Sequence, residues 1–259
     1  MLNLGQQSKF ERLGLVRLPR AIPDGEVETM RDRVWRDLAQ RYRVDPADRK
    51  TWTVRQPTGF QALLSAGAFA PLACPTVCGA LDDLFGAGGW KRPHYWGQPL
   101  VTFPGAEPQW QVPHKQWHLD LPPRSAAPAC PGVRVFAFLS SVLPRGGGTL
   151  VVTGSHRLVQ ALGDRTGNPL RSPEVRKRLM AGDPWFRSLC SADESTDRVR
   201  RFMNDGVVTS GMLVRVVELT GEPGDVILMH GLMLHAPAPN CRSAPRLMVA
   251  QWIGVADGG

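Results

Sequence analysis

The sequence lacks any run of 18 apolar residues, so it predicts no membrane-spanning helix. Its first residues, MLNLGQQSKFERLG, contain no charged stretch followed by an apolar one, which argues against a signal peptide. The five cysteines are odd in number and scattered, and Cys74 and Cys78 have no second Cys or His pair that would complete a zinc site. These absences favour a cytoplasmic protein with reduced thiols.

Nucleic-acid-binding motifs and basic stripes with interleaved aromatic residues are also absent, although the net charge is +8. The basic residues are spread along the chain and are densest at 171–178 and 198–201. We therefore expect a basic enzyme surface, and not a nucleic-acid partner. Neither an internal repeat nor a linker divides the chain, so residues 1–259 are expected to form one domain.

Helical spacing of apolar residues predicts an amphipathic helix from Asp24, its expected N-cap, to Tyr42. Shorter helices are expected at 61–68 and 76–85. Short stretches typical of β-strands lie at 13–18, 98–104, 112–121, 133–139, 149–152, 214–219, 225–230 and 246–253. Strands at this spacing predict a sandwich or a barrel.

Residues 158–209 interrupt the strand pattern. They are polar, with helical segments expected at 173–180 and 184–189 and a charged run at 193–201. We interpret them as a lid-like insertion that could lie over a site.

His118 and Asp120 stand two residues apart in an expected strand that two prolines, at 122 and 123, would end. Residues i and i+2 of a strand project from one face, so both side chains could converge on one ion. A surface polar pair beside a turn explains this short motif equally well. His235, with Arg246 after it, favours the metal interpretation, because two histidines and one carboxylate form the facial triad of non-haem Fe(II) oxygenases.

The order of these motifs resembles the phytanoyl-CoA dioxygenase family of Fe(II)- and 2-oxoglutarate-dependent oxygenases. The resemblance runs from about residue 10 to residue 252 and is carried by His118-x-Asp120, residues 148–156, Gly224-Asp225, His235, Asn240 and Arg246. It implies a mainly β fold with flanking helices, the double-stranded β-helix or jelly roll shared with cupins. It also implies Fe(II), 2-oxoglutarate and O2 as cofactor and co-substrates.

The resemblance makes His118, Asp120 and His235 the iron ligands and catalytic residues. It makes Arg246 the partner of the distal carboxylate of 2-oxoglutarate, which a planar guanidinium binds through two parallel hydrogen bonds. His230 also lies near this motif, but it stands five residues before His235 and would face the opposite side of an extended chain. We expect His230 to be a core or rim histidine.

The co-substrate site departs from the family at Pro237, where relatives often carry a serine whose hydroxyl helps to bind 2-oxoglutarate. Thr102 or Thr149 could supply that hydroxyl. The family's Pro-Gly-Ser-His turn begins here with Thr153, which should change only its rigidity. Phe138 lies where relatives place an aromatic ring beside the co-substrate, although an ordinary core phenylalanine explains it equally well.

Other residues near the iron motif are weaker candidates. Trp110, Lys115 and Trp117 could meet a substrate, although packing explains the tryptophans equally well. Lys115 and Arg134 could pair with an anionic substrate. His156 is expected to have a structural role in a turn, and His114 either lines the mouth of the site or lies in an exposed loop.

Asp120 argues against halogenation, in which a small residue replaces the carboxylate. The expected reaction is hydroxylation of an unactivated C–H bond in a small molecule such as an amino acid or a natural-product intermediate, with release of succinate and CO2. Desaturation and ring formation use the same ligands and stay open. So do two other classes, a cupin-like metal protein and a non-catalytic protein that binds 2-oxoglutarate or nucleic acid.

Overall fold

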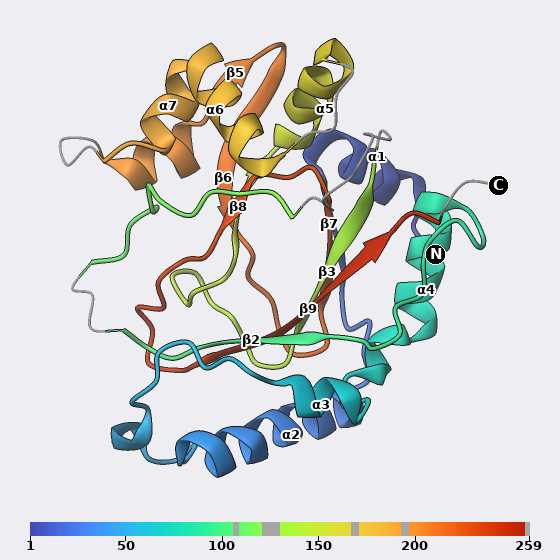
Figure 1. The fold of residues 1–259 in the computed structure, drawn as a ribbon, viewed down its shortest axis with the longest axis vertical. Helices are drawn as coiled ribbons and strands as arrows, with labels where there is room; N and C mark the ends of the chain where they lie inside the picture. Colours follow the sequence, from blue (N-terminus) through green and yellow to red (C-terminus); the bar gives the residue numbers. More distant parts are fainter. Residues whose placement is uncertain (106–108, 121–129, 167–170, 193–196, 257–259) are drawn as a thin grey trace.

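Two antiparallel sheets face each other at the centre of the computed structural model, which describes residues 1–105, 109–120, 130–166, 171–192 and 197–256 (Figure 1). The five-stranded sheet has the order β1 (Leu15–Leu18), β7 (Val226–His230), β3 (Gly132–Phe138), β9 (Arg246–Gly254), β2 (Gln98–Thr102). The four-stranded sheet has the order β5 (Val207–Thr209), β6 (Met212–Glu218), β4 (Leu150–Thr153), β8 (His235–Ala236). Facing antiparallel sheets with flanking helices are the architecture that the sequence predicts.

Strand β3 shows how the core is divided. Val133 and Val135 pack outward into the larger apolar cluster with the helices, whereas Phe136 and Phe138 point inward and meet side chains of both sheets. This alternation follows from the two-residue period of a strand. The inner face of the sandwich is therefore the side on which a site between the sheets must lie.

Helices cover both outer faces (Figure 1). The outer face of the five-stranded sheet packs against an apolar cluster that includes residues of α1 (Leu4–Leu13), α2 (Asp24–Tyr42) and α4 (Pro75–Phe85), and α3 (Gln61–Ser65) lies beside α2. The four-stranded sheet is covered by α5 (Ser155–Thr166), α6 (Ser172–Gly182) and α7 (Pro184–Leu189). Short 3-10 turns at Arg49–Thr51 and Ala70–Ala73 and a π-helical turn at Arg200–Asp205 complete the regular elements of the described chain.

The segment 158–209 packs on the outer face of the smaller sheet. Val159, Val175 and Phe186 share one apolar cluster with Leu150 and Val214 of that sheet. The two helices expected in this segment are confirmed as α6 and α7, and α5 and β5 were not anticipated. Its action as a lid stays a prediction.

The strand predicted at 112–121 is wrong. Within its described part only one isolated bridge forms, at His118, and residues 121–123 lie outside the described residues. Proline at 113 donates no ladder hydrogen bond, and Gln116 has a left-handed backbone with φ of 65°, which a strand cannot contain. The His-x-Asp motif therefore lies on an irregular segment held by other contacts.

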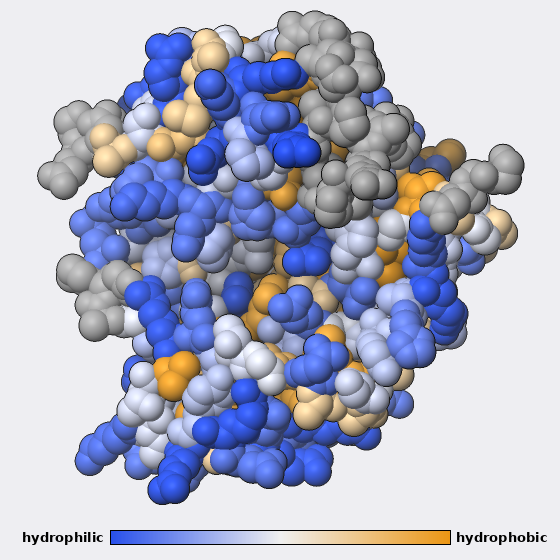
Figure 2. All heavy atoms as spheres, in the orientation of Figure 1, coloured by the Kyte–Doolittle hydropathy of each residue, from blue (hydrophilic) through white to orange (hydrophobic). Residues whose placement is uncertain are grey.

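Other boundaries differ from expectation as well: the helix expected at 61–68 ends at Ser65, and the strand expected at 98–104 ends at Thr102. Leu13 ends α1 instead of opening a strand, and β1 begins at Leu15. Asp24 is the first residue of α2 and Pro23 is its cap. Among the described residues no helix is long and apolar enough to cross a membrane. The face in Figure 2 is mostly hydrophilic, with hydrophobic residues in small separate spots.

Candidate metal centre

His118 and His235 come from segments far apart in the sequence and are joined by their backbones. Each donates its N–H to the carbonyl of the other, at 2.9 and 3.0 Å, which places the ring centroids 4.3 Å apart. His235 begins β8 and pairs with Val151 of β4, so its side chain faces the interior of the sandwich. The bridge brings His118 to the same place.

Both imidazole rings are oriented by a backbone carbonyl two residues earlier. Nδ1 of His118 lies 2.7 Å from the carbonyl oxygen of Gln116, and Nδ1 of His235 lies 3.0 Å from that of Met233. A carbonyl only accepts, so each Nδ1 carries a proton, and in the neutral imidazole the Nε2 lone pair is then free for a metal. Burial, followed by the nearby His235, lowers the pKa of His118, which favours the neutral, ligating form.

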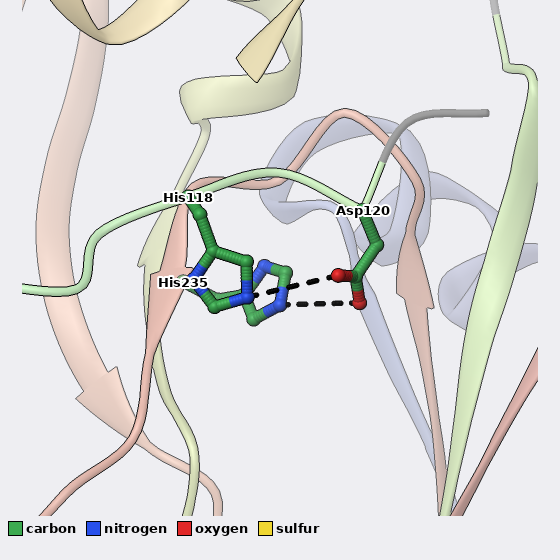
Figure 3. A group of neighbouring side chains, drawn as sticks. All are labelled: His118, Asp120 and His235. Atoms are coloured by element: carbon green, nitrogen blue, oxygen red, sulfur yellow. Dashed lines mark ion pairs between the residues drawn. The ribbon is translucent and has the colours of Figure 1, made fainter. Parts of the chain in front are cut away.

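Asp120 completes the group (Figure 3). Its Oδ1 lies 3.6 Å from Nε2 of His118, and its Oδ2 lies 3.3 Å from Nε2 of His235. Burial raises the pKa of Asp120, but its contacts with His235 and Arg134 outweigh burial and lower the pKa to about 2. Asp120 is therefore an ionised carboxylate beside the two imidazole rings.

These three side chains fit a divalent metal ion. They are two imidazoles and one carboxylate, and their ligand atoms lie within 4.8 Å of one another. Neighbouring donors that share an ion with bonds of about 2.1 Å are roughly 3 Å apart, close to the distances of 3.3 and 3.6 Å between Asp120 and the two histidines.

Arg134, on the inner face of β3, is the charged neighbour of this group. Its Nη2 lies 3.1 Å from Oδ2 of Asp120, and its Nε is buried without an acceptor. In this structure Arg134 forms an ion pair with Asp120, and its pairing with an anionic substrate stays a prediction.

Arg246 opens β9 on the same inner face, opposite Thr102 of β2. Its Nη1 donates to the carbonyl of Gly147 at 2.6 Å, and its buried Nε has no hydrogen-bond partner. Burial lowers the pKa of Arg246 to about 10, while the carboxylate of Glu218 acts in the opposite direction. A buried guanidinium with an unused donor fits the carboxylate of a ligand.

The turn beside Arg246 is held by Glu218, which accepts hydrogen bonds from the backbone N–H groups of Arg145 and Gly148. Gly147 has φ of 81°, and a Cβ at Gly148 would lie 2.1 Å from the carbonyl oxygen of Leu219. Only glycine satisfies both positions without strain or collision. The carbonyl that meets Arg246 is therefore placed by a rigid turn.

A cavity of about 470 Å³ reaches Arg246 from the side of β2. Thr102, Leu100 and Pro237 line it together with the loop at 56–61. Thr149 is buried and lies one residue before β4, whose last pair with β8 joins Leu150 to Ala236. Both threonines thus lie near Pro237, and neither contact with a co-substrate is tested.

A second cavity, of about 560 Å³, adjoins the first at Gln56 and Pro237. Its lining combines three basic or imidazole side chains with four glutamines: Arg55, His114, Lys115, Gln56, Gln109, Gln111 and Gln116. No acidic residue is among the described residues that line it. His114 and Lys115 line this cavity, and a role of either residue toward a substrate stays a prediction.

The phytanoyl-CoA dioxygenase family matches residues 10–248. The chain belongs to this family. It is therefore an Fe(II)- and 2-oxoglutarate-dependent oxidoreductase with the jelly-roll fold, as the resemblance implies. A comparison with curated proteins gave no match.

Solved structures support the fold of this dioxygenase. HygX from Streptomyces hygroscopicus, with nickel and 2-oxoglutarate bound, is 21% identical with a TM-score of 0.57, over 98% of this chain and 87% of HygX. HygX with nickel, 2-oxoglutarate and hygromycin B has a TM-score of 0.53 at 20% identity, again over 98% of this chain and 87% of HygX. The epimerase SnoN, with Fe3+, alpha-ketoglutarate and nogalamycin RO, has a TM-score of 0.53 at 17% identity, over 96% of this chain and 82% of SnoN.

The other candidates of this dioxygenase lie apart from the metal centre. His230 packs its ring against Phe10 and His156, and Nδ1 of His230 accepts from the N–H of Leu232. His156 lies in the first turn of α5, not in a turn after a strand, and its Nε2 contacts the carbonyl of Glu11. Both are buried structural histidines.

The aromatic candidates pack in the core. Trp110 and Trp117 belong to the cluster on the smaller sheet, and their indole N–H groups donate to the carbonyls of Pro239 and Pro113. Phe138 is fully buried in the interior cluster with Val151. A contact between Phe138 and the co-substrate stays a prediction.

Sequence reasoning missed the residues that hold the irregular metal segment in place. Arg198 is buried and donates to the carbonyls of Val112 and Pro113, and the hydroxyl of Ser172 accepts from the N–H of Leu119. Both residues belong to the 158–209 segment, so that segment supports the metal centre. No motif marks them, since they contact backbone groups, which any sequence offers.

Proposed function

We propose that this dioxygenase holds Fe(II) through His118, Asp120 and His235, and that Arg246 binds the distal carboxylate of 2-oxoglutarate. The observation that carries the proposal is the convergence of two imidazole Nε2 atoms on one carboxylate, with His118 Nε2 3.6 Å from Oδ1 and His235 Nε2 3.3 Å from Oδ2 of Asp120. When bound, the iron with 2-oxoglutarate activates O2, which supplies one oxygen atom to succinate and one to the product. The proposed reaction converts R–H, 2-oxoglutarate and O2 into R–OH, succinate and CO2.

The protein's own part in this reaction is positioning. The Nδ1 contacts of the histidines point both lone pairs at one place, and Arg246 would orient the co-substrate from the opposite end of the interior. Apolar side chains of both sheets, among them Phe136, Val151 and Met248, keep the interior dry. Charge interactions are stronger where water is excluded.

The second cavity, of about 560 Å³, supports a polar small-molecule substrate. Its glutamines offer donors and acceptors to hydroxyl and carbonyl groups, and Lys115 can pair with an anionic group. The absence of a carboxylate among its described lining residues disfavours a polycationic substrate. HygX and SnoN, which share the fold, have bound hygromycin B and nogalamycin RO, and these ligands are small molecules as well.

Anaerobic reconstitution of the apo-protein with Fe(II), followed by 2-oxoglutarate, tests the proposal. Chelation at adjacent open positions of a facial triad gives a weak charge-transfer band in the visible spectrum. We expect the band in the wild-type protein and its loss in His118→Ala and His235→Ala. Well-folded, iron-loaded protein without the band would favour the cupin-like or binding-protein alternatives.

The reaction type needs a product. Candidate polar metabolites that stimulate succinate formation would be turned over under 18O2. Incorporation of one labelled oxygen atom into the product supports hydroxylation. An unlabelled product with a new double bond, a new ring or an inverted carbon centre contradicts it.

A further inference from the structure

Each ligand of the metal centre has one neighbour that can set its orientation. For His118 and His235 this neighbour is a backbone carbonyl at Nδ1. For Asp120 it is the guanidinium of Arg134, 3.1 Å from Oδ2. Partners of this kind govern the geometry and the affinity of metal sites.

We propose that Arg134 is the positioning residue for Asp120, holding one carboxylate oxygen so that the other binds the metal alone. This inference rests on the proposed function of the same site. Single-oxygen coordination by Asp120 leaves the remaining positions of a facial triad open for the two oxygens of 2-oxoglutarate and for O2. If both oxygens of Asp120 bound the metal, one of those positions would be filled.

The backbone leaves Asp120 in need of such a partner. The bridge that joins His118 to His235 ends before Asp120. The next backbone contact is the hydrogen bond from the N–H of Leu119 to the hydroxyl of Ser172. Neither contact restrains rotation of the Asp120 carboxylate. A side-chain partner has to do so.

Arg134 is well placed for this task because its own backbone is fixed. It lies in the middle of β3, paired with Met229 of β7 on one side and Trp252 of β9 on the other. Among the described residues, Asp120 is the ion-pair partner of its side chain, and its buried Nε has no hydrogen-bond acceptor. The guanidinium of Arg134 therefore pairs with the proposed metal ligand Asp120.

The positive charge of Arg134 predicts opposite effects on the affinities for the metal and for 2-oxoglutarate. A guanidinium beside Asp120 repels a divalent cation, so it opposes metal binding while it holds the ligand in place. Removing it should leave metal affinity equal or greater and should weaken chelation of 2-oxoglutarate. A residue that served only to stabilise the fold would lower both affinities together.

The test compares Arg134→Met, Arg134→Lys and the exposed-surface control Arg36→Met, all in the full chain, with Ni(II) as a redox-inert metal and Co(II) as a spectroscopic one. For Arg134→Met we expect Ni(II) affinity equal to or above that of the wild type, and 2-oxoglutarate affinity of the Ni(II)-loaded protein lowered about 10-fold or more. The absorption spectrum of Co(II) without 2-oxoglutarate should change, because Asp120 then offers both oxygens. For Arg134→Lys we expect a 2-oxoglutarate affinity between those of the wild type and Arg134→Met, since lysine keeps the charge without the planar fork.

Two results would overturn the inference. One is an Arg134→Met protein whose Co(II) spectrum and 2-oxoglutarate affinity equal those of the wild type. The other is a parallel fall of metal affinity, 2-oxoglutarate affinity and melting temperature, which marks a merely structural residue. If wild-type protein binds Co(II) but not 2-oxoglutarate, the proposed function fails, and the Co(II) spectra alone decide the role of Arg134.

Discussion

His118 and His235 hold each other through a reciprocal pair of backbone hydrogen bonds, 2.9 and 3.0 Å long. The two rings therefore lie side by side before any ion binds. Because backbone groups make this contact, it does not depend on either imidazole. A side-chain substitution at either histidine can therefore test metal binding without removing the backbone contact that positions the two segments.

Replacing His118 with alanine should remove a ligand and leave the bridge. We expect Ni(II) affinity to fall at least ~100-fold, more than the loss of an outer partner usually costs, with little change in melting temperature. Calorimetric titration and thermal denaturation measure the two effects. His94→Ala, at an exposed position away from the centre, is the control, and equal Ni(II) affinity in the two variants would exclude His118 as a ligand.

Arg246 should govern co-substrate binding without affecting the metal. Arg246→Met removes a buried guanidinium that would pair with a carboxylate, and such losses cost about 2 kcal/mol or more, equivalent to a ~30-fold rise in the Kd of 2-oxoglutarate. Ni(II) affinity should stay within a few-fold of the wild type. Arg246→Lys should recover little, because an ammonium lacks the planar fork.

An unchanged Kd for 2-oxoglutarate in Arg246→Met would favour the cupin-like alternative. The same measurement on Arg242→Met is the control. Arg242 lies in the loop that leads into β9, but it donates to the carbonyl of Pro144 and does not line the cavity at Arg246.

The sequence predicts the three candidate ligand positions, but it does not show which contacts arrange them. His118 and Asp120 were assigned to a strand, yet their segment is irregular and is held by Arg198 and Ser172. Arg134 was recognised only as a basic residue, because its contact with Asp120 depends on how β3 faces the metal segment. Strand β3 is predictable from the sequence, because its run of β-branched and aromatic residues is typical of a buried strand.

Helix α1 is marked in the sequence by its N-terminal cap and not by hydrophobic periodicity. Its sequence is polar, and of its residues only Phe10 is buried, so hydrophobic periodicity is weak. The capping box between Asn3 and Gln6 does mark its start. Helices with one buried residue need their caps to be recognised.

The hydroxyl that replaces the family's serine at Pro237 can be found with two isosteric variants. Thr102 lines the cavity that reaches Arg246, whereas Thr149 does not line it. We expect Thr102→Val to raise the Kd of 2-oxoglutarate about 5-fold, corresponding to one hydrogen bond of ~1 kcal/mol, and Thr149→Val to change it less. The reverse order would assign the role to Thr149, and no effect of either would exclude both.

Glu218 should affect 2-oxoglutarate through Arg246. Glu218→Gln weakens the hydrogen bonds to Arg145 and Gly148 and removes the charge that favours the Arg246 guanidinium. Hydrogen bonds to a charged group contribute about 1.5–3 kcal/mol, so we expect a ~10-fold rise in the Kd of 2-oxoglutarate with some loss of stability. Glu222→Gln, at an exposed residue near the same turn region, should change neither, and an unaltered Kd in Glu218→Gln would contradict this role.

Stability of the apo-protein should depend on pH through its buried histidines. Burial is the main cause that lowers the pKa of His118 and of His156 below the ordinary 6.5. Between the lowered values and 6.5 the unfolded chain binds more protons than the folded one, so the free energy of unfolding rises with pH and levels off above 6.5. Urea denaturation from about pH 5 to about pH 8 measures this slope. His118→Gln should reduce the slope, and the part that remains is the contribution of His156.

Saturating Ni(II) should steepen the slope in the wild type, because the metal binds only the unprotonated imidazole. A slope that Ni(II) does not change would mean that His118 is not a ligand.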